Sequence, residues 1–220
     1  MPYNGRTMGL NTLVYYLVLV PSLLIAITGH EFAHAWVANR FGDPTAAQRG
    51  RLSLNPLAHL DPIGTLAIFL IGFGWGRPVP VNRSLLRHPR ADLWVSAAGP
   101  LSNLLMAASV GLLVRLPAVW GAIELAGFAP AAGVFVPVFV QMNIMLAVFN
   151  FLPIGPLDGS HVLENLLPIG PSLQFQRFNA GYGNLLLLGL ILLGRVLPVS
   201  PLSVLLDPPI AFFRQLFLGA

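Results

Sequence analysis

Residues 10–38 read LNTLVYYLVLVPSLLIAITGHEFAHAWVA, an apolar stretch that carries His30, Glu31 and His34 near its end. A stretch of this length predicts a helix that crosses a bilayer. Two imidazoles and a carboxylate are costly to bury at that depth, so their presence indicates a functional site. On a helix, His30 and His34 lie one turn apart on the same face, where they can bind one zinc ion. Glu31 lies beside that ion as a candidate general base, so the stretch predicts hydrolysis within a membrane.

The composition supports a membrane protein. Hydrophobic residues make up 55% of the chain and charged residues only 9%, whereas a soluble domain carries about 25% charged residues. The net charge is +4, and all twelve basic residues are arginine, which fits loops that face the lipid bilayer and its anionic headgroups. The arginines are scattered and form no basic helix, so no nucleic-acid partner is expected. The absence of cysteine excludes thiolate zinc ligands.

Three further apolar stretches, at residues 93–116, 131–152 and 183–198, predict additional membrane spans. Residues 160–180 predict short helices near the membrane interface. The tail from Pro208, which is rich in phenylalanine, predicts an amphipathic piece that lies in the interface. We therefore expect an all-α polytopic membrane protein, with a single integral membrane domain over residues 1–220.

The apolar stretch at residues 62–75 is too short for an ordinary crossing helix. If it crossed, the arginine-rich loops at 40–51 and 77–90 would lie on opposite sides of the membrane, against the positive-inside rule. We therefore expect four crossings plus one re-entrant element at 62–75. The alternative is a full crossing there, which gives five transmembrane helices. With the re-entrant element, His34 and the sequence Pro-Leu-Asp-Gly at 156–159 fall on the same side.

A catalytic zinc needs three protein ligands and one open position. Asp158 is the favoured third ligand, because it directly follows the span at 131–152 in a segment broken by Pro153 and Pro156. Unwound backbone at membrane depth is tolerated only where protein buries it or water reaches it. The expected ligand set is therefore His30, His34 and Asp158.

Other roles for the polar residues near this site stay open. Asp158 could instead cap the helix that follows it. His161 lies one turn past Asp158 and could be a ligand, but we expect it to lie beside the site or at the interface. Asn103, in the middle of the second span, is expected to hold helices together.

The sequence His-Glu-x-x-His in one span, followed by Asn150-x-x-Pro153 and Leu-Asp158-Gly after a later span, resembles the site-2 protease family of intramembrane zinc metalloproteases. The segments GRLSLNPLAHLDPIGT at 50–65, RPVPVN at 77–82 and AGPLSN at 98–103 are similar to its compact prokaryotic branch, which has no PDZ or CBS domain. The resemblance extends over residues 25–165.

The resemblance implies one zinc ion per chain and hydrolysis of a peptide bond in or near the transmembrane segment of single-pass membrane substrates. It places the protein in a prokaryotic cell membrane, with the active site toward the cytoplasmic side. It implies that Asn150 helps to hold the substrate backbone or the oxyanion, although Asn150 could equally satisfy carbonyls freed near Pro153. It also implies a small β-strand region over 45–55 and 78–82, where substrate pairs by strand addition.

The alternative function is that of a non-catalytic metal-binding membrane protein, either a transporter or a protease-like scaffold. A transporter needs polar residues along several spans, but the ionisable residues cluster at one depth, and the centres of the spans at 93–116 and 131–149 carry almost none of them. A scaffold that has lost catalysis would be expected to lack Glu31 or a ligand, and none is missing. The five histidines are too few for a di-iron oxidase, and the motifs of serine and aspartyl intramembrane proteases do not occur.

Overall fold

The computed structural model describes residues 5–61, 63–64 and 76–219. The described residues are 77% helical, which confirms the all-α class. Among them, four helical stretches are long and apolar enough to cross a membrane: Val14–Arg40, Ala91–Val114, Ala129–Asn150 and Ile169–Val196. In chain order the helices are α1 (Gly5–Arg40), α2 (Thr45–Gln48), η1 (Pro56–Ala58), η2 (Arg83–Leu85), α4 (Ala91–Val114), α5 (Pro117–Leu125), α6 (Ala129–Asn150), α7 (Asp158–Leu166), α8 (Ile169–Phe178), the π-helix η3 (Asn179–Gly183), α9 (Asn184–Val196) and α10 (Pro201–Leu218).

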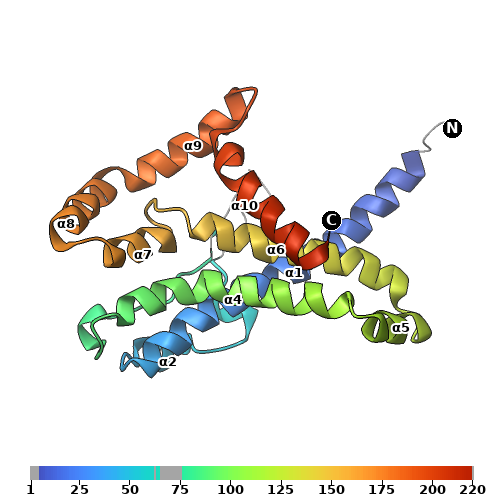
Figure 1. Cartoon of the computed structure of the whole chain (residues 1–220), viewed down its shortest axis with the longest axis horizontal. Coiled ribbons are helices and arrows are strands. Elements are labelled where there is room, and N and C mark those ends of the chain that lie inside the picture. Colours follow the sequence, from blue (N-terminus) through green and yellow to red (C-terminus); the bar gives the residue numbers. More distant parts are fainter. Residues whose placement is uncertain (1–4, 62, 65–75, 220) are drawn as a thin grey trace.

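Helices α1, α4 and α6 pack against one another, and α10 packs on α6 and α4 (Figure 1). Many of the residues buried in α1, α4 and α6 are small, which lets helix backbones approach closely; they include Ala26, Ala97, Gly99, Ala107 and Ala147. The buried residues of this core are Ala107, Val136, Val140, Ile144, Val148 and Phe217. The three predicted spans at 10–38, 93–116 and 131–152 correspond to α1, α4 and α6 within a few residues.

The last predicted span begins earlier than the sequence suggested. Helix α8 continues through η3 into α9, so the apolar helical stretch starts at Ile169 rather than at residue 183. Two glycines within η3 imply a break, because glycine weakens a helix interior. The chain passes them as a π-helix, in which the backbone stays hydrogen-bonded while the turn widens.

The C-terminal tail forms part of a longer helix than the sequence predicted. The amphipathic interfacial piece expected from Pro208 is part of α10, which continues through Pro208 and Pro209. One face of α10 lies against α4 and α6, and Phe217 is only 6% exposed there. The phenylalanines therefore serve helix packing as well as the surface, since Phe212 on another face is exposed.

The described residues contain no β-strand, and the pair Leu60 and Gly76 forms an isolated antiparallel bridge. The strand predicted at 45–55 is wrong at its start, where α2 forms. Asp43 begins that turn, because its carboxylate accepts hydrogen bonds from the backbone N–H and the hydroxyl of Thr45. Within the part of the chain that the structure describes, the segment at 78–82 forms no strand, and Pro78 and Pro80 have no N–H to donate to a ladder.

Asp43 also joins two loops that are distant in sequence. It is fully buried, and its second oxygen accepts from the Asn82 N–H at 2.6 Å. Burial raises the pKa of the Asp43 carboxyl, but the hydrogen bonds from Thr45 and Asn82 outweigh burial and hold the pKa below its usual value. The same loops meet again where the Arg87 N–H donates to the Phe41 carbonyl. The stretch at 62–75 lies almost wholly outside the described residues, so the re-entrant element stays a prediction.

Candidate metal centre

His30, His34 and Asp158 come together from two helices. The imidazoles lie one turn apart on α1, and Asp158 is the first residue of α7. The distances are 3.1 Å between the two Nε2 atoms, 3.1 Å from His30 Nε2 to Asp158 Oδ2, and 3.3 Å from His34 Nε2 to Asp158 Oδ2. Ligand atoms around a tetrahedral zinc with bonds of about 2.0–2.1 Å lie roughly 3.3 Å apart. The triangle therefore has the dimensions of a zinc site.

The hydrogen bonds behind the two imidazoles indicate that the triangle is suited to a cation. His34 Nδ1 lies 2.7 Å from the Val95 carbonyl oxygen, which can only accept, so Nδ1 carries the proton. His30 Nδ1 lies 2.7 Å from Asn103 Oδ1 and donates in the same way. Both Nε2 atoms then present lone pairs to Asp158 Oδ2, which is buried and has no hydrogen-bond partner. Three acceptors facing one another fit a metal ion better than any neutral group.

Asp158 supplies the negative charge of the cluster, and its Oδ2 lies within 3.3 Å of both Nε2 atoms. Among the described residues, the group that could hold a metal consists of His30, His34 and Asp158, and His161 is not part of it.

Helix α4 supports the site from behind. It supplies both acceptors, the Val95 carbonyl and Asn103, and the backbone at Gly99 lies directly against the two imidazoles. The Asn103 amide is fixed in one orientation, because its Nδ2 donates to the Ala26 carbonyl at 2.9 Å and to Asn143 at 3.0 Å. The sequence predicts only a packing role for Asn103. Its position in the middle of an apolar span could have indicated a role in the metal site, since polar residues within membrane spans usually serve function.

Replacing Asn103 with leucine is expected to weaken zinc binding by about 10- to 100-fold, the usual cost of losing a partner behind a ligating histidine. Leucine is close to asparagine in size but cannot accept from His30 Nδ1, so the imidazole loses its fixed tautomer and orientation. Competition with a chromogenic chelator measures the zinc affinity of the purified protein. Ser102→Ala is the matched control, because Ser102 bonds helix carbonyls and touches no ligand. Equal zinc affinities for Asn103→Leu and the native chain would contradict this role.

Glu31 lines the same cavity as the three candidate metal ligands. The cavity has a volume of about 550 Å³, and its lining includes His30, Glu31, His34, Asn150, Asp158 and His161. The carboxylate of Glu31 accepts a hydrogen bond from the Val79 N–H at 3.0 Å, which fixes one of its two oxygens. The segment that carries Val79 forms one wall of the cavity. This placement suits a proton acceptor beside the metal.

Asn150 and His161 lie on the cavity without joining the cluster. The Asn150 Nδ2 donates to the Leu146 carbonyl at 2.9 Å, while the side chain still lines the cavity. The structure therefore leaves both predicted uses of Asn150 open. His161 Nδ1 lies 2.8 Å from Arg83 and 3.1 Å from Glu164, so His161 takes part in a polar network at the edge of the cavity.

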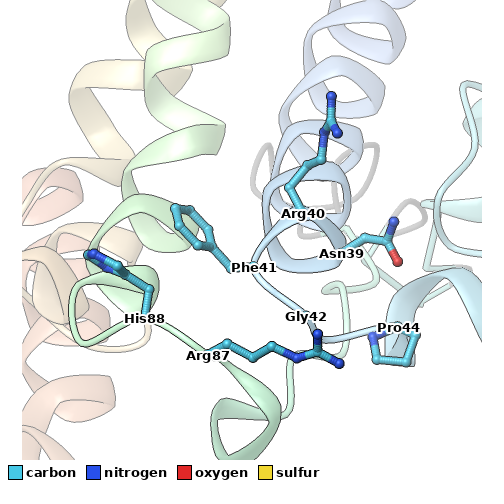
Figure 2. Close-up of a pocket in the computed structure, with 7 residues that line it drawn as sticks. All are labelled: Asn39, Arg40, Phe41, Gly42, Pro44, Arg87 and His88. Carbon is cyan, nitrogen blue, oxygen red and sulfur yellow. The ribbon is translucent and has the colours of Figure 1, made fainter.

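A second hollow, which contains none of the candidate metal ligands, lies at the C-terminal end of α1 (Figure 2). It has a volume of about 510 Å³ and is lined by Asn39, Arg40, Phe41, Gly42, Pro44, Arg87 and His88. The basic side chains in it point in different directions, and none of the predicted site residues contributes to it. The chemistry indicated by the sequence therefore belongs to the cavity that holds the two imidazoles and Asp158.

A helical membrane protein in which two imidazoles, one carboxylate and a neighbouring glutamate share a cavity has the components of a metallohydrolase. The chain is 47% identical over 160 residues to "Putative zinc metalloprotease YwhC" of Bacillus subtilis, and the match covers 72% of both chains. It is 33% identical over 157 residues to "Putative zinc metalloprotease Rip2" of Mycolicibacterium smegmatis, covering 68% of this chain and 57% of that one. The chain belongs to the site-2 protease family of zinc metalloproteases, so the resemblance seen in the sequence is confirmed.

More distant relatives share only part of their length with this chain. It is 28% identical over 168 residues to "Putative zinc metalloprotease Rip3" of Mycobacterium tuberculosis, and the match covers 35% of that protein. No family model and no solved structure matches the chain.

Proposed function

We propose that the chain is an intramembrane zinc metalloprotease that hydrolyses a peptide bond in or near the transmembrane segment of single-pass membrane proteins. One observation carries the proposal: the cluster of His30, His34 and Asp158 shares a cavity with Glu31, and His30, Glu31 and His34 lie within a helix long and apolar enough to cross a membrane. A soluble substrate would not need a site at that depth. The names of the relatives support metalloprotease chemistry.

The three clustered side chains would hold one zinc ion. When bound, zinc would supply Lewis-acid chemistry at the scissile carbonyl. Glu31 takes a proton from the attacking water and later passes it to the leaving amine. The Val79 N–H holds one oxygen of Glu31 in place, which leaves the other oxygen to carry the proton. Asn150 lies on the cavity, where its amide would hold the substrate backbone or the developing oxyanion.

A transmembrane substrate has to unwind before it is cut, because a helix shields its own peptide bonds. The segment at 78–82 supports this step, since Pro78, Val79 and Val81 line the cavity and no strand of the described residues pairs with the segment. An unwound substrate would pair with the segment at 78–82 as an added strand. The backbone carbonyls of this segment would then accept hydrogen bonds from the substrate's N–H groups.

The proposed orientation places the cavity toward the cytoplasm of a prokaryotic cell membrane. The arginine-rich loops at 40–51 and 77–90 contact each other, through Asn82 and Asp43 and through Arg87 and Phe41, so they share one side. Leu60 and Gly76, which flank the stretch at 62–75, form an antiparallel bridge. Both observations support a stretch that returns to the side from which it started, with the arginines at the cytoplasmic surface.

Coexpression with a panel of single-pass membrane proteins tests the proposal. The native chain is expected to shorten at least one of them, whereas Glu31→Gln is expected to leave it intact while still binding one zinc ion, because glutamine cannot accept the proton. Immunoblotting follows the substrate, and elemental analysis counts the zinc. Glu124→Gln is the matched control, because Glu124 bonds Trp120 on α5, away from the cavity. Cleavage by Glu31→Gln at the native rate would rule out Glu31 as the general base. Absence of any cleavage by the native chain would instead favour a transporter or a scaffold.

A further inference from the structure

Asn179 connects the fourth apolar helical stretch to the turn that precedes Asp158. It is the first residue of the π-helix η3, and its Oδ1 accepts a hydrogen bond from the Gly155 N–H at 2.8 Å. Single π-turns inside longer helices are rare and often occur at functional sites. Here the widened turn lies beside the backbone of the segment that leads to a metal ligand.

The two segments touch at backbone distance. A Cβ added at Gly183 would lie 2.7 Å from Asn179 Oδ1 and 3.0 Å from the Gly155 carbonyl oxygen. A Cβ added at Gly155 would lie 3.2 Å from the Asn179 side-chain amide. Glycine at both positions therefore lets the π-helix and the turn lie close enough for the hydrogen bond to form.

An apolar contact lies next to this hydrogen bond. Leu187, one turn past Gly183, is buried against Ile154 and Leu157, which lie on either side of Gly155 in the chain. Asn179, Gly183 and Leu187 are spaced four residues apart, so they form one face of the continuous helix. The rest of that helical stretch is mostly exposed. Its described contact with the turn is therefore concentrated in a short stripe.

The stripe of Asn179, Gly183 and Leu187 contacts the turn between α6 and α7. Within the turn, the Leu157 N–H donates to the Ile154 carbonyl, and Asp158 follows directly as the first residue of α7. Gly155 lies three residues before Asp158, so a shift of its peptide moves the carboxylate relative to the imidazoles on α1. Metal ligands must be held within about 0.5 Å of their working positions.

We propose that Asn179 is a positioning residue for the metal centre, which sets the place of the Asp158 carboxylate through the Gly155 peptide. The inference rests on the proposed function for its meaning in catalysis, but the role in zinc binding stands separately. The fourth apolar stretch thereby completes a site whose ligands lie on other elements.

Zinc affinity of the purified full-length chain, measured by chelator competition, tests the inference. Asn179→Leu removes the acceptor and is expected to weaken zinc binding about 10-fold, the lower end of the cost of losing an outer partner of a metal site. Asn179→Asp keeps an acceptor oxygen and is expected to restore affinity to within about twofold of the native value. Asn184→Leu is the matched control, since Asn184 is exposed five residues further along the same helical stretch.

Gly183→Ala provides a second variant, in which the acceptor stays but the added Cβ forces Asn179 and Gly155 apart. It is expected to weaken zinc binding in the same direction, while the melting temperatures of the zinc-free variants stay close to native. Native zinc affinity in both Asn179→Leu and Gly183→Ala would overturn the inference, as would failure of Asn179→Asp to restore affinity. If the native chain bound zinc but cut no substrate, the proposed protease function would fail while the zinc measurements would still decide the role of Asn179.

Discussion

Replacing Gly99 with alanine is expected to abolish zinc binding and to lower proteolysis at least about 10³-fold, although Gly99 ligates nothing. A Cβ at this position would lie 2.3 Å from His34 Nε2 and 2.6 Å from His30 Nε2, well inside van der Waals contact. The rings cannot turn away freely, because the Val95 carbonyl and Asn103 hold their Nδ1 atoms. Helix α4 would have to move back from α1, which separates the imidazoles from their supports. Elemental analysis and a cleavage assay measure the two losses.

Gly133→Ala is the control for this substitution. Gly133 also lies in a long apolar helix, α6, but an added Cβ there meets nothing within 4 Å. Alanine also favours a helix more than glycine does, so this variant is expected to be at least as stable as the native chain. A Gly99→Ala protein with native zinc content would show that α4 does not approach the imidazoles as closely as described.

Asp158→Asn is expected to have the second large effect, with a loss of zinc affinity greater than about 100-fold and cleavage near background. The substitution keeps the size of the side chain but removes the negative charge that faces the two Nε2 atoms. An amide oxygen is a weaker zinc ligand than a carboxylate, and the amide N–H₂ would present protons to the cation. Chelator competition gives the affinity, and coexpression with a cleaved substrate gives the activity.

Asp207→Asn makes the same chemical change at an exposed position on α10 and is expected to leave zinc affinity and cleavage unchanged. Retention of native zinc affinity by Asp158→Asn would show that this aspartate is not the third ligand. The structure also gives it no capping role, since Leu157 is the N-cap of α7 and no side chain caps the helix. His161 would then be the first residue to test as a third ligand, because it lies on the same cavity.

The sequence predicted the three candidate metal ligands better than the residues that hold those ligands in place. The spacing of His30 and His34 and the proline-broken segment before Asp158 are local signals, and the structure brings these three residues together. The role of Gly99 depends instead on how closely α4 packs against α1, which no pattern within α4 reveals. Asn103 is conspicuous as a polar residue in an apolar span, but the sequence could not show that its partner on α1 is His30.

The errors have physical causes of the same kind. The last span was expected to begin at residue 183, yet the helix runs unbroken through η3, where close packing on the turn at Gly155 favours glycine and the π-helix keeps its hydrogen bonds. The phenylalanines of α10 suggested contact with lipid, yet Phe217 packs on neighbouring helices. In an apolar chain, residues that face lipid and residues that face another helix have the same composition, so hydropathy alone cannot separate them.

The pair Asn103 and Asn143 has a consequence for biogenesis. Asn103 links His30 on α1 to Asn143 on α6, so one hydrogen-bonded chain joins three helices. While only α1 and α4 have emerged from the ribosome, Asn143 is still missing from this series of hydrogen bonds, and Asp158 emerges later still. We therefore expect zinc binding to follow the insertion of α6 and the emergence of Asp158, which a pulse-labelled, truncated chain that ends before residue 158 would test by its failure to bind zinc.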